Sequence, residues 1–157
     1  MHIIPIEEGI RPMINRFIAE HWFSTLMVVR GTAVDMTELD GFAVLEDGQV
    51  TGLVTYKTED GECEIMSLDS LKENRGIGTG LVNEVVAAAR KAGCRKVKLV
   101  TTNDNLRAFS FYQKRGFDMA ALYRNALDAA RAIKPEIPLM GENNIPLRHE
   151  IEFELSL

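Results

Sequence analysis

The chain has few cysteines and no long apolar stretch, and each of these absences excludes a class of protein. Its two cysteines, Cys63 and Cys94, stand in apolar surroundings without a CxxC pair or a Cys/His cluster, so we expect buried, reduced thiols and no metal site. No apolar stretch approaches the roughly 20 residues of a membrane span. Glu7 and Glu8 stand where a signal peptide would need an apolar core, and we therefore expect a cytoplasmic protein.

Positive charge is also in short supply. Lys and Arg number 18 against 23 Asp and Glu, a formal net charge of −5, and no long Lys/Arg run occurs. This balance argues against a dedicated nucleic-acid or anionic-membrane surface and mildly favours cationic substrates such as amines. With 157 residues, 46% of them hydrophobic, the chain is long enough for a substantial core, and we expect one domain over residues 1–157.

The spacing of apolar residues is helical in some segments and alternating in others. From residue 26 to residue 68 the segments are mostly strand-like, and Asp47-Gly48 between two of them is a hairpin signal, so the N-terminal half is antiparallel β in character. An α/β (α+β) fold follows, with a sheet of about six to seven strands flanked by helices. The expected helices are 8–22, 76–92, 106–115 and 124–133, and the expected strands are 26–30, 41–46, 50–57, 62–68, 95–101, 117–123 and 150–157.

The last segment alternates between apolar residues and glutamates. Ile151 and Phe153 would lie on one face and Glu150 and Glu152 on the other, which predicts a half-exposed antiparallel strand. An exposed edge on this strand would be compatible with a homodimer. The Pro-rich connection 134–148 before it is longer than most loops of a compact domain, so we expect it to be a functional cover, an interface or slack.

The densest chemical signal is a Gly-rich turn between a strand and a helix, at residues 73–81. Glycines let the backbone approach an anion closely, and the first N–H groups of the following helix are unpaired and lie at its positive end. Arg75 adds a positive charge. No Gly-Lys-Ser/Thr follows, so the turn is not a P-loop, and Leu81 replaces the third glycine of the dinucleotide fingerprint. Only Asp104, at the end of the next strand, keeps a dinucleotide interpretation open.

Two motifs in this part of the chain resemble those of the GNAT superfamily of N-acetyltransferases. The superfamily's pyrophosphate loop, Gln/Arg-x-x-Gly-x-Gly/Ala, matches at Gly76 and Gly78, with the usual leucine at Leu81. Glu73 departs from the pattern, because a carboxylate stands where the superfamily has Gln or Arg. The second motif, Asn-x-x-Ala-x-x-x-Tyr-x-x-x-Gly-Phe, matches at every spacing. Its residues in this chain are Asn105, Ala108, Tyr112, Gly116 and Phe117.

The resemblance implies a GNAT-like single domain with a mixed central sheet whose fourth and fifth strands splay apart. It also implies acetyl-CoA as co-substrate, with the pantetheine arm lying in the gap between these strands. A backbone N–H near Leu68 would stabilise the charge that develops on the thioester oxygen, a contribution of about 3 kcal/mol in comparable sites. The implied coenzyme-binding positions are Met66, Leu68, Asn74, Arg75, Gly76, Ile77, Gly78, Thr79, Asn105 and Ala108.

Tyr112 matches the position of the superfamily's usual general acid, which protonates the departing thiolate. Its reference pKa of about 10 keeps it protonated at neutral pH, as that role requires. The alternative is a core tyrosine packed beside Phe109 and Phe111. Asn105 is open to two compatible interpretations, a coenzyme contact and an N-cap of the helix that follows it.

The attacking amine must lose a proton, because most alkyl amines are ammonium ions near pH 7, so a base or a water chain is needed. Glu62 and Glu64 are our candidates for this base. Alternation along the strand would place both on one face with Met66 and Leu68. The alternative is two solvated glutamates at the end of a sheet.

Acceptor residues in this superfamily come from its variable N-terminal helices and C-terminal loop, so the motifs do not identify the acceptor. His21 and Trp22 close the first helix and are candidates for lining the acceptor site, although an aromatic residue there is also compatible with the core. His149 has no assigned partner.

These observations together predict an N-acetyltransferase that transfers an acetyl group from acetyl-CoA to a primary amine by direct attack in a ternary complex. The amine is either a small molecule or a protein amino group. The alternative is a catalytically silent acyl-CoA-binding module, for which Glu73 is the only hint. A third hypothesis is a nucleotide-binding oxidoreductase fragment, which leaves the second motif unexplained.

Overall fold

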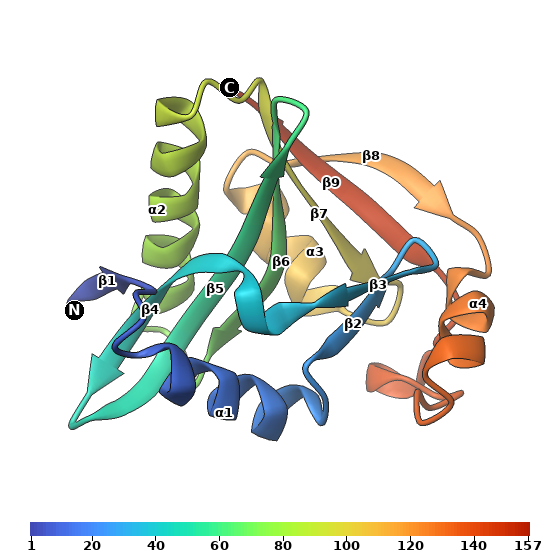
Figure 1. Cartoon of the computed structure of the whole chain (residues 1–157). Coiled ribbons are helices and arrows are strands. Elements are labelled where there is room, and N and C mark those ends of the chain that lie inside the picture. Colours follow the sequence, from blue (N-terminus) through green and yellow to red (C-terminus); the bar gives the residue numbers. More distant parts are fainter. The chain divides into compact units, whose positions relative to one another are not determined.

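A computed structural model describes all residues from 1 to 157 (Figure 1). The chain divides into two compact units. The first unit contains Met1–Leu26, Asp35–Val97 and Leu157, and the second contains Met27–Val34 and Lys98–Ser156. None of the helices is both long and apolar enough to cross a membrane.

The first unit is built on four antiparallel strands in the order β1-β4-β5-β6. The antiparallel character expected for the N-terminal half is thereby confirmed. Asp47 and Gly48 both have positive φ angles, 52° and 75°, which suits the tight hairpin turn between two of these strands. The elements are β1 (Ile3–Pro5), α1 (Arg11–Trp22), the 3₁₀ turn η1 (Met36–Glu38), β4 (Asp40–Glu46), β5 (Gln49–Glu59), β6 (Glu62–Ser70) and α2 (Ile77–Lys91).

The two helices of this unit lie on opposite faces of β5. A Cβ built on Gly52 would stand 2.5 Å from Ile77 Cγ2, so Gly52 faces α2 at close range and only a glycine fits there without a shift. Leu53 faces the other way and pairs with Asp69, whose side chain contacts Trp22 of α1. Figure 1 shows α2 running beside β4, β5 and β6. The buried face of α2 is the predicted one, formed by Ile77, Leu81, Val82, Val85, Val86 and Ala89.

A β-bulge in β6 changes which side chains share a face. Thr55 pairs with Ser67 and Tyr56 pairs with Ile65, so Met66 is an extra residue on β6. Alternation therefore reverses at Met66. The prediction that Glu62 and Glu64 share a face with Leu68 is wrong, because counting by twos does not hold across an inserted residue. The side chains of β6 that share the face of Leu53 and Thr55 are Glu62, Glu64, Ser67 and Asp69.

The second unit has three neighbouring strands in the order β7-β9-β8, with β8 and β9 antiparallel. Because β9 lies between two partners, the expected exposed edge on the C-terminal strand is wrong, and β8 is the outer strand of the three. A separate two-stranded hairpin is formed by β2 and β3. The elements are β2 (Leu26–Val29), β3 (Thr32–Asp35), β7 (Lys96–Thr102), α3 (Leu106–Lys114), β8 (Asp118–Tyr123), α4 (Ala126–Ile133), the 3₁₀ turn η2 (Glu142–Asn144) and β9 (Glu150–Ser156); Leu26, Asp35, Lys96 and Val97 belong to the first unit.

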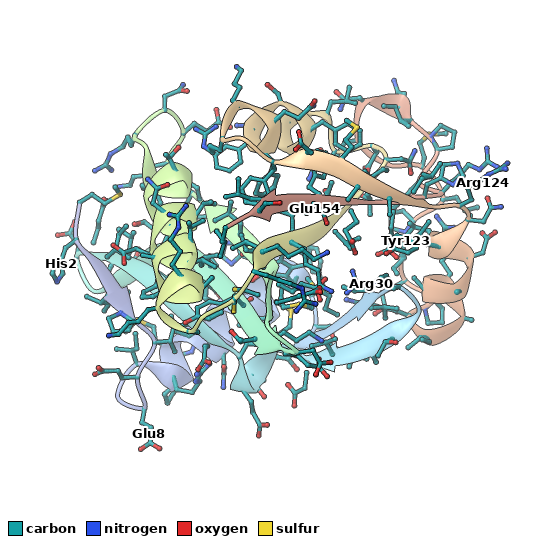
Figure 2. The ribbon with its side chains drawn as sticks, turned by 90° about the horizontal axis from the view of Figure 1, so that it is seen from above. His2, Glu8, Arg30, Tyr123, Arg124 and Glu154 are labelled. Carbon is teal, nitrogen blue, oxygen red and sulfur yellow. The ribbon has the colours of Figure 1, made fainter.

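The glutamate face of β9 is buried rather than half-exposed. Glu150 and Glu152 are only 4% and 9% exposed. The backbone N–H of Arg30 donates to Glu150 at 3.0 Å, and Glu152 accepts from the Arg30 guanidinium at 3.2 Å and from the Tyr123 hydroxyl at 3.1 Å. Figure 2 shows Arg30 and Tyr123 near one another, while Arg124 points outward. The alternating pattern predicted the strand correctly, but partners that are distant in the sequence bury its glutamate face.

Several local boundaries also differ from the sequence-based prediction. The first helix begins at Arg11 instead of residue 8, and the last begins at Ala126 instead of residue 124. The short strands β1 and β3 were not predicted, because three or four residues are too few for a periodic pattern.

Candidate active site

The Gly-rich turn leads into α2 with its amide groups left open. Gly76 is the N-cap residue, has a φ of 74°, and no side chain caps the helix. A Cβ at Gly76 would meet no atom within 4 Å, so space lies beside the backbone at this point. Gly78 and Thr79 follow in the first turn, while Asn74, with a φ of 59°, precedes it on the exposed side. The first N–H groups of this 15-residue helix thus form an arrangement suited to an anionic group.

Two cations of this turn are held by one carboxylate. Glu46 at the end of β4 accepts from Arg75 through both of its oxygens, at 3.0 and 3.2 Å, and also forms an ion pair with Lys72. These contacts hold the pKa of Glu46 below its usual value. The positive charge predicted at Arg75 is therefore present beside the turn but shared with an internal anion. Glu73, the departure from the family pattern, is exposed.

The candidate coenzyme positions on β6 lie at the bulge. Met66 is the bulged residue and is 6% exposed, and Leu68 pairs with Val54 one step beyond the bulge. Bulges occur often beside active sites, because they interrupt regular pairing and redirect side chains. On the face of β6 opposite to Leu68, the hydroxyl groups of Thr55 and Ser67 form a buried hydrogen bond of 2.6 Å.

The two glutamates predicted as bases occupy different surroundings on β6. Glu62 lies at the β5–β6 hairpin, where it forms ion pairs with Arg95 at 2.5 Å and Lys96 at 3.9 Å. Glu64 is 3% exposed and pairs with Lys57 across the strands. The interpretation of two solvated glutamates is therefore wrong for Glu64, and Glu62 has a structural role at the hairpin.

A third carboxylate of β6, Asp69, was missed by the sequence analysis. Trp22 Nε1 donates a hydrogen bond of 3.0 Å to Asp69 Oδ2. Burial raises the pKa of Asp69, and the Trp22 hydrogen bond and the charge of His21 oppose part of this rise. His21 itself stacks on Phe17 with ring centroids 3.9 Å apart and donates from Nδ1 to the Phe17 carbonyl at 3.0 Å. Trp22 therefore contacts an ionisable group 47 positions away in the sequence, and His21 influences the pKa of the same group. No local sequence motif predicts this contact.

In the second unit, Tyr112 sits within an aromatic cluster. The ring is 6% exposed and makes edge contacts with Phe111 and Phe117, at centroid distances of 5.0 and 5.4 Å. Phe153 of β9 lies 6.2 Å away. This packing fixes the position of the ring, in agreement with the interpretation of Tyr112 as a core tyrosine.

Asn105 caps α3 as predicted. Its side-chain oxygen accepts from the Ala108 N–H at 3.1 Å, which satisfies one of the unpaired donors at the start of the helix. Such a cap is worth about 1 kcal/mol of stability. The motif positions Asn105 and Ala108 are therefore joined by a hydrogen bond, and the conformational role of this pair is independent of any ligand.

Asp104 is engaged by the long connection 134–148. Its Oδ2 accepts from the Glu142 N–H at 2.8 Å, its Oδ1 accepts from the Thr102 hydroxyl at 2.5 Å, and it is 6% exposed. A Cβ on Gly141 would stand 2.3 Å from Oδ2. The carboxylate that kept a dinucleotide interpretation open is thus occupied by the protein's own backbone.

The same connection is held at a second point by Asn103. Asn103 Oδ1 accepts from the N–H groups of Arg148 and His149, both at 2.9 Å. His149 Nδ1 in turn accepts from the Asn125 N–H at 2.9 Å, which gives this histidine a partner. The connection is therefore an ordered part of the second unit rather than slack.

Both cysteines are buried and unpaired, as predicted. Burial raises the pKa of the Cys63 thiol to about 12, which keeps it protonated and unreactive at neutral pH. No group of three or more His, Cys, Asp or Glu side chains is arranged to hold a metal ion.

Comparison with known proteins adds family membership to this geometry. The model of the acetyltransferase (GNAT) family matches residues 12–117. The uncharacterized protein YdhI of Bacillus subtilis (strain 168) is 47% identical over 154 residues, which cover 98% of this chain and 96% of the relative.

Two solved structures share the fold over nearly the whole chain. The IAA acetyltransferase of Bacillus cereus ATCC 14579 superposes with a TM-score of 0.72 at 20% identity, covering 99% of both chains. A GNAT family acetyltransferase of Elizabethkingia anophelis, solved with acetyl-CoA bound, superposes with a TM-score of 0.70 at 18% identity, covering 99% of this chain and 97% of the other. The chain belongs to the GNAT acetyltransferase family.

Proposed function

We propose that this protein is an acetyl-CoA-dependent N-acetyltransferase that transfers the acetyl group to a primary amine by direct attack. The observation that carries this proposal is the start of α2. There a GNAT motif coincides with a left-handed glycine, an uncapped helix and open space beside the backbone. This combination suits the pyrophosphate of coenzyme A, because unpaired amide groups at the positive end of a helix bind anions. The solved relative with acetyl-CoA bound supports the same co-substrate.

The chain's own residues supply the remaining functions in this proposal. The backbone of β6 around Met66 and Leu68 orients the pantetheine arm, and a backbone N–H near Leu68 polarises the thioester carbonyl. The residues of the turn that contact phosphate groups are Asn74, Arg75, Gly76, Ile77, Gly78 and Thr79. Asn105 and Ala108 serve as further coenzyme contacts.

Tyr112 is the proposed general acid, which donates its hydroxyl proton to the departing thiolate. The aromatic cluster around its ring supports this role, because a fixed ring holds the hydroxyl group in one place. The reference pKa of a tyrosine hydroxyl group, about 10, suits a proton donor at neutral pH.

Calorimetric titration with acetyl-CoA, followed by a thiol-release screen against amines and peptides, tests the proposal. We expect saturable binding and thiol release with one class of acceptor. Binding without release for every acceptor would support the silent acyl-CoA-binding module instead. Absence of binding would contradict the proposal at its base.

Substitution of Tyr112 by Phe tests the catalytic step within this scheme. Tyr112→Phe keeps the ring and its packing, so acetyl-CoA affinity should stay within about twofold while turnover falls by about 10²-fold or more. Tyr56→Phe, which removes the hydroxyl group of a half-buried tyrosine on β5, is the matched control and should leave turnover unchanged. Equal turnover in all three proteins would exclude Tyr112 as the acid.

A further inference from the structure

Asp69 is an ionisable group that the reaction outlined above does not use. It lies one residue beyond Leu68 on β6, and regular alternation after the bulge at Met66 puts its side chain on the face of Ser67. Trp22 Nε1 donates to its Oδ2 at 3.0 Å and so fixes the carboxyl group to the C-terminal end of α1. This is the segment in which we expect the acceptor to bind.

The surroundings of Asp69 favour a proton acceptor. Its only titratable neighbour on α1 is His21, whose charge lowers the pKa in opposition to burial. β5 places Leu53 opposite Asp69, and Ser67 precedes it on the same face of β6, and neither side chain ionises near neutral pH. Burial is the stronger influence, so the pKa of Asp69 is raised and its carboxylate is a stronger base than that of an exposed aspartate.

Asp69 is also better placed to meet a substrate than Glu62, at the other end of β6. Glu62 is committed to Arg95 and Lys96 at the far hairpin. The Asp69 hydrogen bond from Trp22 involves Oδ2 alone, and Oδ1 is not among the buried polar atoms that lack a partner. Asp69 is only partly buried, so part of this residue remains in contact with solvent.

We propose that Asp69 binds the ammonium group of the acceptor and takes its proton before attack, so that the substrate is a cationic primary amine. This inference rests on the proposed acetyltransferase function.

The proton and bond changes balance in this scheme. The ammonium group gives one proton to Asp69, and the neutral nitrogen then forms a bond to the thioester carbonyl carbon while the C–S bond breaks. The leaving thiolate takes a proton from Tyr112. The nitrogen sheds its second proton, which restores Tyr112 through solvent, and Asp69 releases the first proton to solvent. One proton is therefore released for each amine acetylated.

Asp69→Asn is the decisive variant, because an asparagine oxygen still accepts the Trp22 hydrogen bond. The probes are spermidine, tyramine or a peptide N-terminus, whichever is acetylated fastest by the wild type, compared with hydroxylamine, which is already neutral near pH 7. We expect kcat/KM for the ammonium substrate to fall by about 10²- to 10⁴-fold, with less than about a tenfold loss for hydroxylamine. Acetyl-CoA affinity should stay within about twofold. The control is Glu59→Gln, which changes an exposed residue of β5 and should behave as wild type.

Each other outcome overturns the inference in a recognisable way. Ammonium turnover within threefold of wild type in Asp69→Asn would make Asp69 a structural tether of α1. Equal losses with both nucleophiles would exclude deprotonation as its role. Wild-type protein that neither binds acetyl-CoA nor acetylates hydroxylamine would overturn the proposed function itself, and this inference with it.

Two further measurements separate catalysis from folding. Because the folded-state pKa of Asp69 is raised, ionisation of this group costs stability as pH rises above its unfolded value, so Asp69→Asn should be at least as stable as wild type at pH 7. Trp22→Phe removes the hydrogen bond that favours the carboxylate. It should therefore move the acidic limb of the kcat/KM profile to higher pH, whereas a purely structural contact would leave this limb in place.

Discussion

The helices α2 and α3 differ in how their first backbone N–H groups are capped. Each helix begins with unpaired N–H groups that need a partner. At α3, Asn105 provides it from within the chain, since its side chain accepts from the Ala108 N–H. At α2, Gly76 provides no side chain at all, and the space beside it is open. The difference is that a side chain completes one helix start, while the other keeps uncapped amide groups with open space beside Gly76.

The largest effect that would break this comparison is a charge at the open start. Gly76→Asp places a carboxylate beside the amides of α2, so we expect acetyl-CoA affinity to fall by at least about tenfold. Gly48→Asp is the matched control, because Gly48 also has a φ near 75° and no atom within 4 Å of a built Cβ. Both variants should lose roughly 1 kcal/mol of stability from the left-handed backbone. Calorimetric titration with acetyl-CoA measures the affinity of both variants. An equal loss of affinity in the two would contradict the comparison.

A smaller effect is expected at the closed start. Asn105→Ala removes the cap, so the free energy of unfolding should fall by about 1 kcal/mol and the melting temperature by about 2–4 °C. Asn105→Asp keeps an oxygen acceptor and should melt close to wild type. Scanning calorimetry distinguishes the two. A full loss of stability in the aspartate variant would mean that capping does not explain the position.

The smallest effect concerns the cations beside the open start. Glu46→Gln releases Lys72 and Arg75 from their shared carboxylate, so acetyl-CoA should bind about two- to threefold more tightly at low ionic strength. The gain should shrink in high salt, because exposed charges are screened. Weaker binding by Glu46→Gln would indicate that Glu46 positions the cations for the ligand instead of competing with it.

Much of the fold could be read from local patterns. The helix at 77–91 and its buried face follow from apolar residues at helical spacing, and the hairpin at Asp47-Gly48 follows from residues that tolerate positive φ angles. The cap at Asn105 is equally local. Each of these features depends on residues within a few positions of one another, which is why periodicity and turn chemistry suffice.

The errors concern features that depend on distant partners. The glutamate face of β9 looked solvent-exposed, yet Arg30 and Tyr123 bury it through hydrogen bonds from remote segments. The neighbours of β9 likewise depend on strand order, which alternation within one strand does not encode. The position of Asp104 at the end of a strand suggested a ligand contact, but its carboxylate accepts a hydrogen bond from the Glu142 backbone N–H instead.

The sequence by itself determined the family and the open start of α2, because motif spacing and glycine conformations are properties of contiguous residues. Only the tertiary structure decided which side chains of β6 face α1. The bulge at Met66 is set by pairing with β5, and the contact between Trp22 and Asp69 joins residues 47 positions apart. Strand register and helix packing are collective, so a side chain's neighbours across a sheet emerge only when the whole unit has folded.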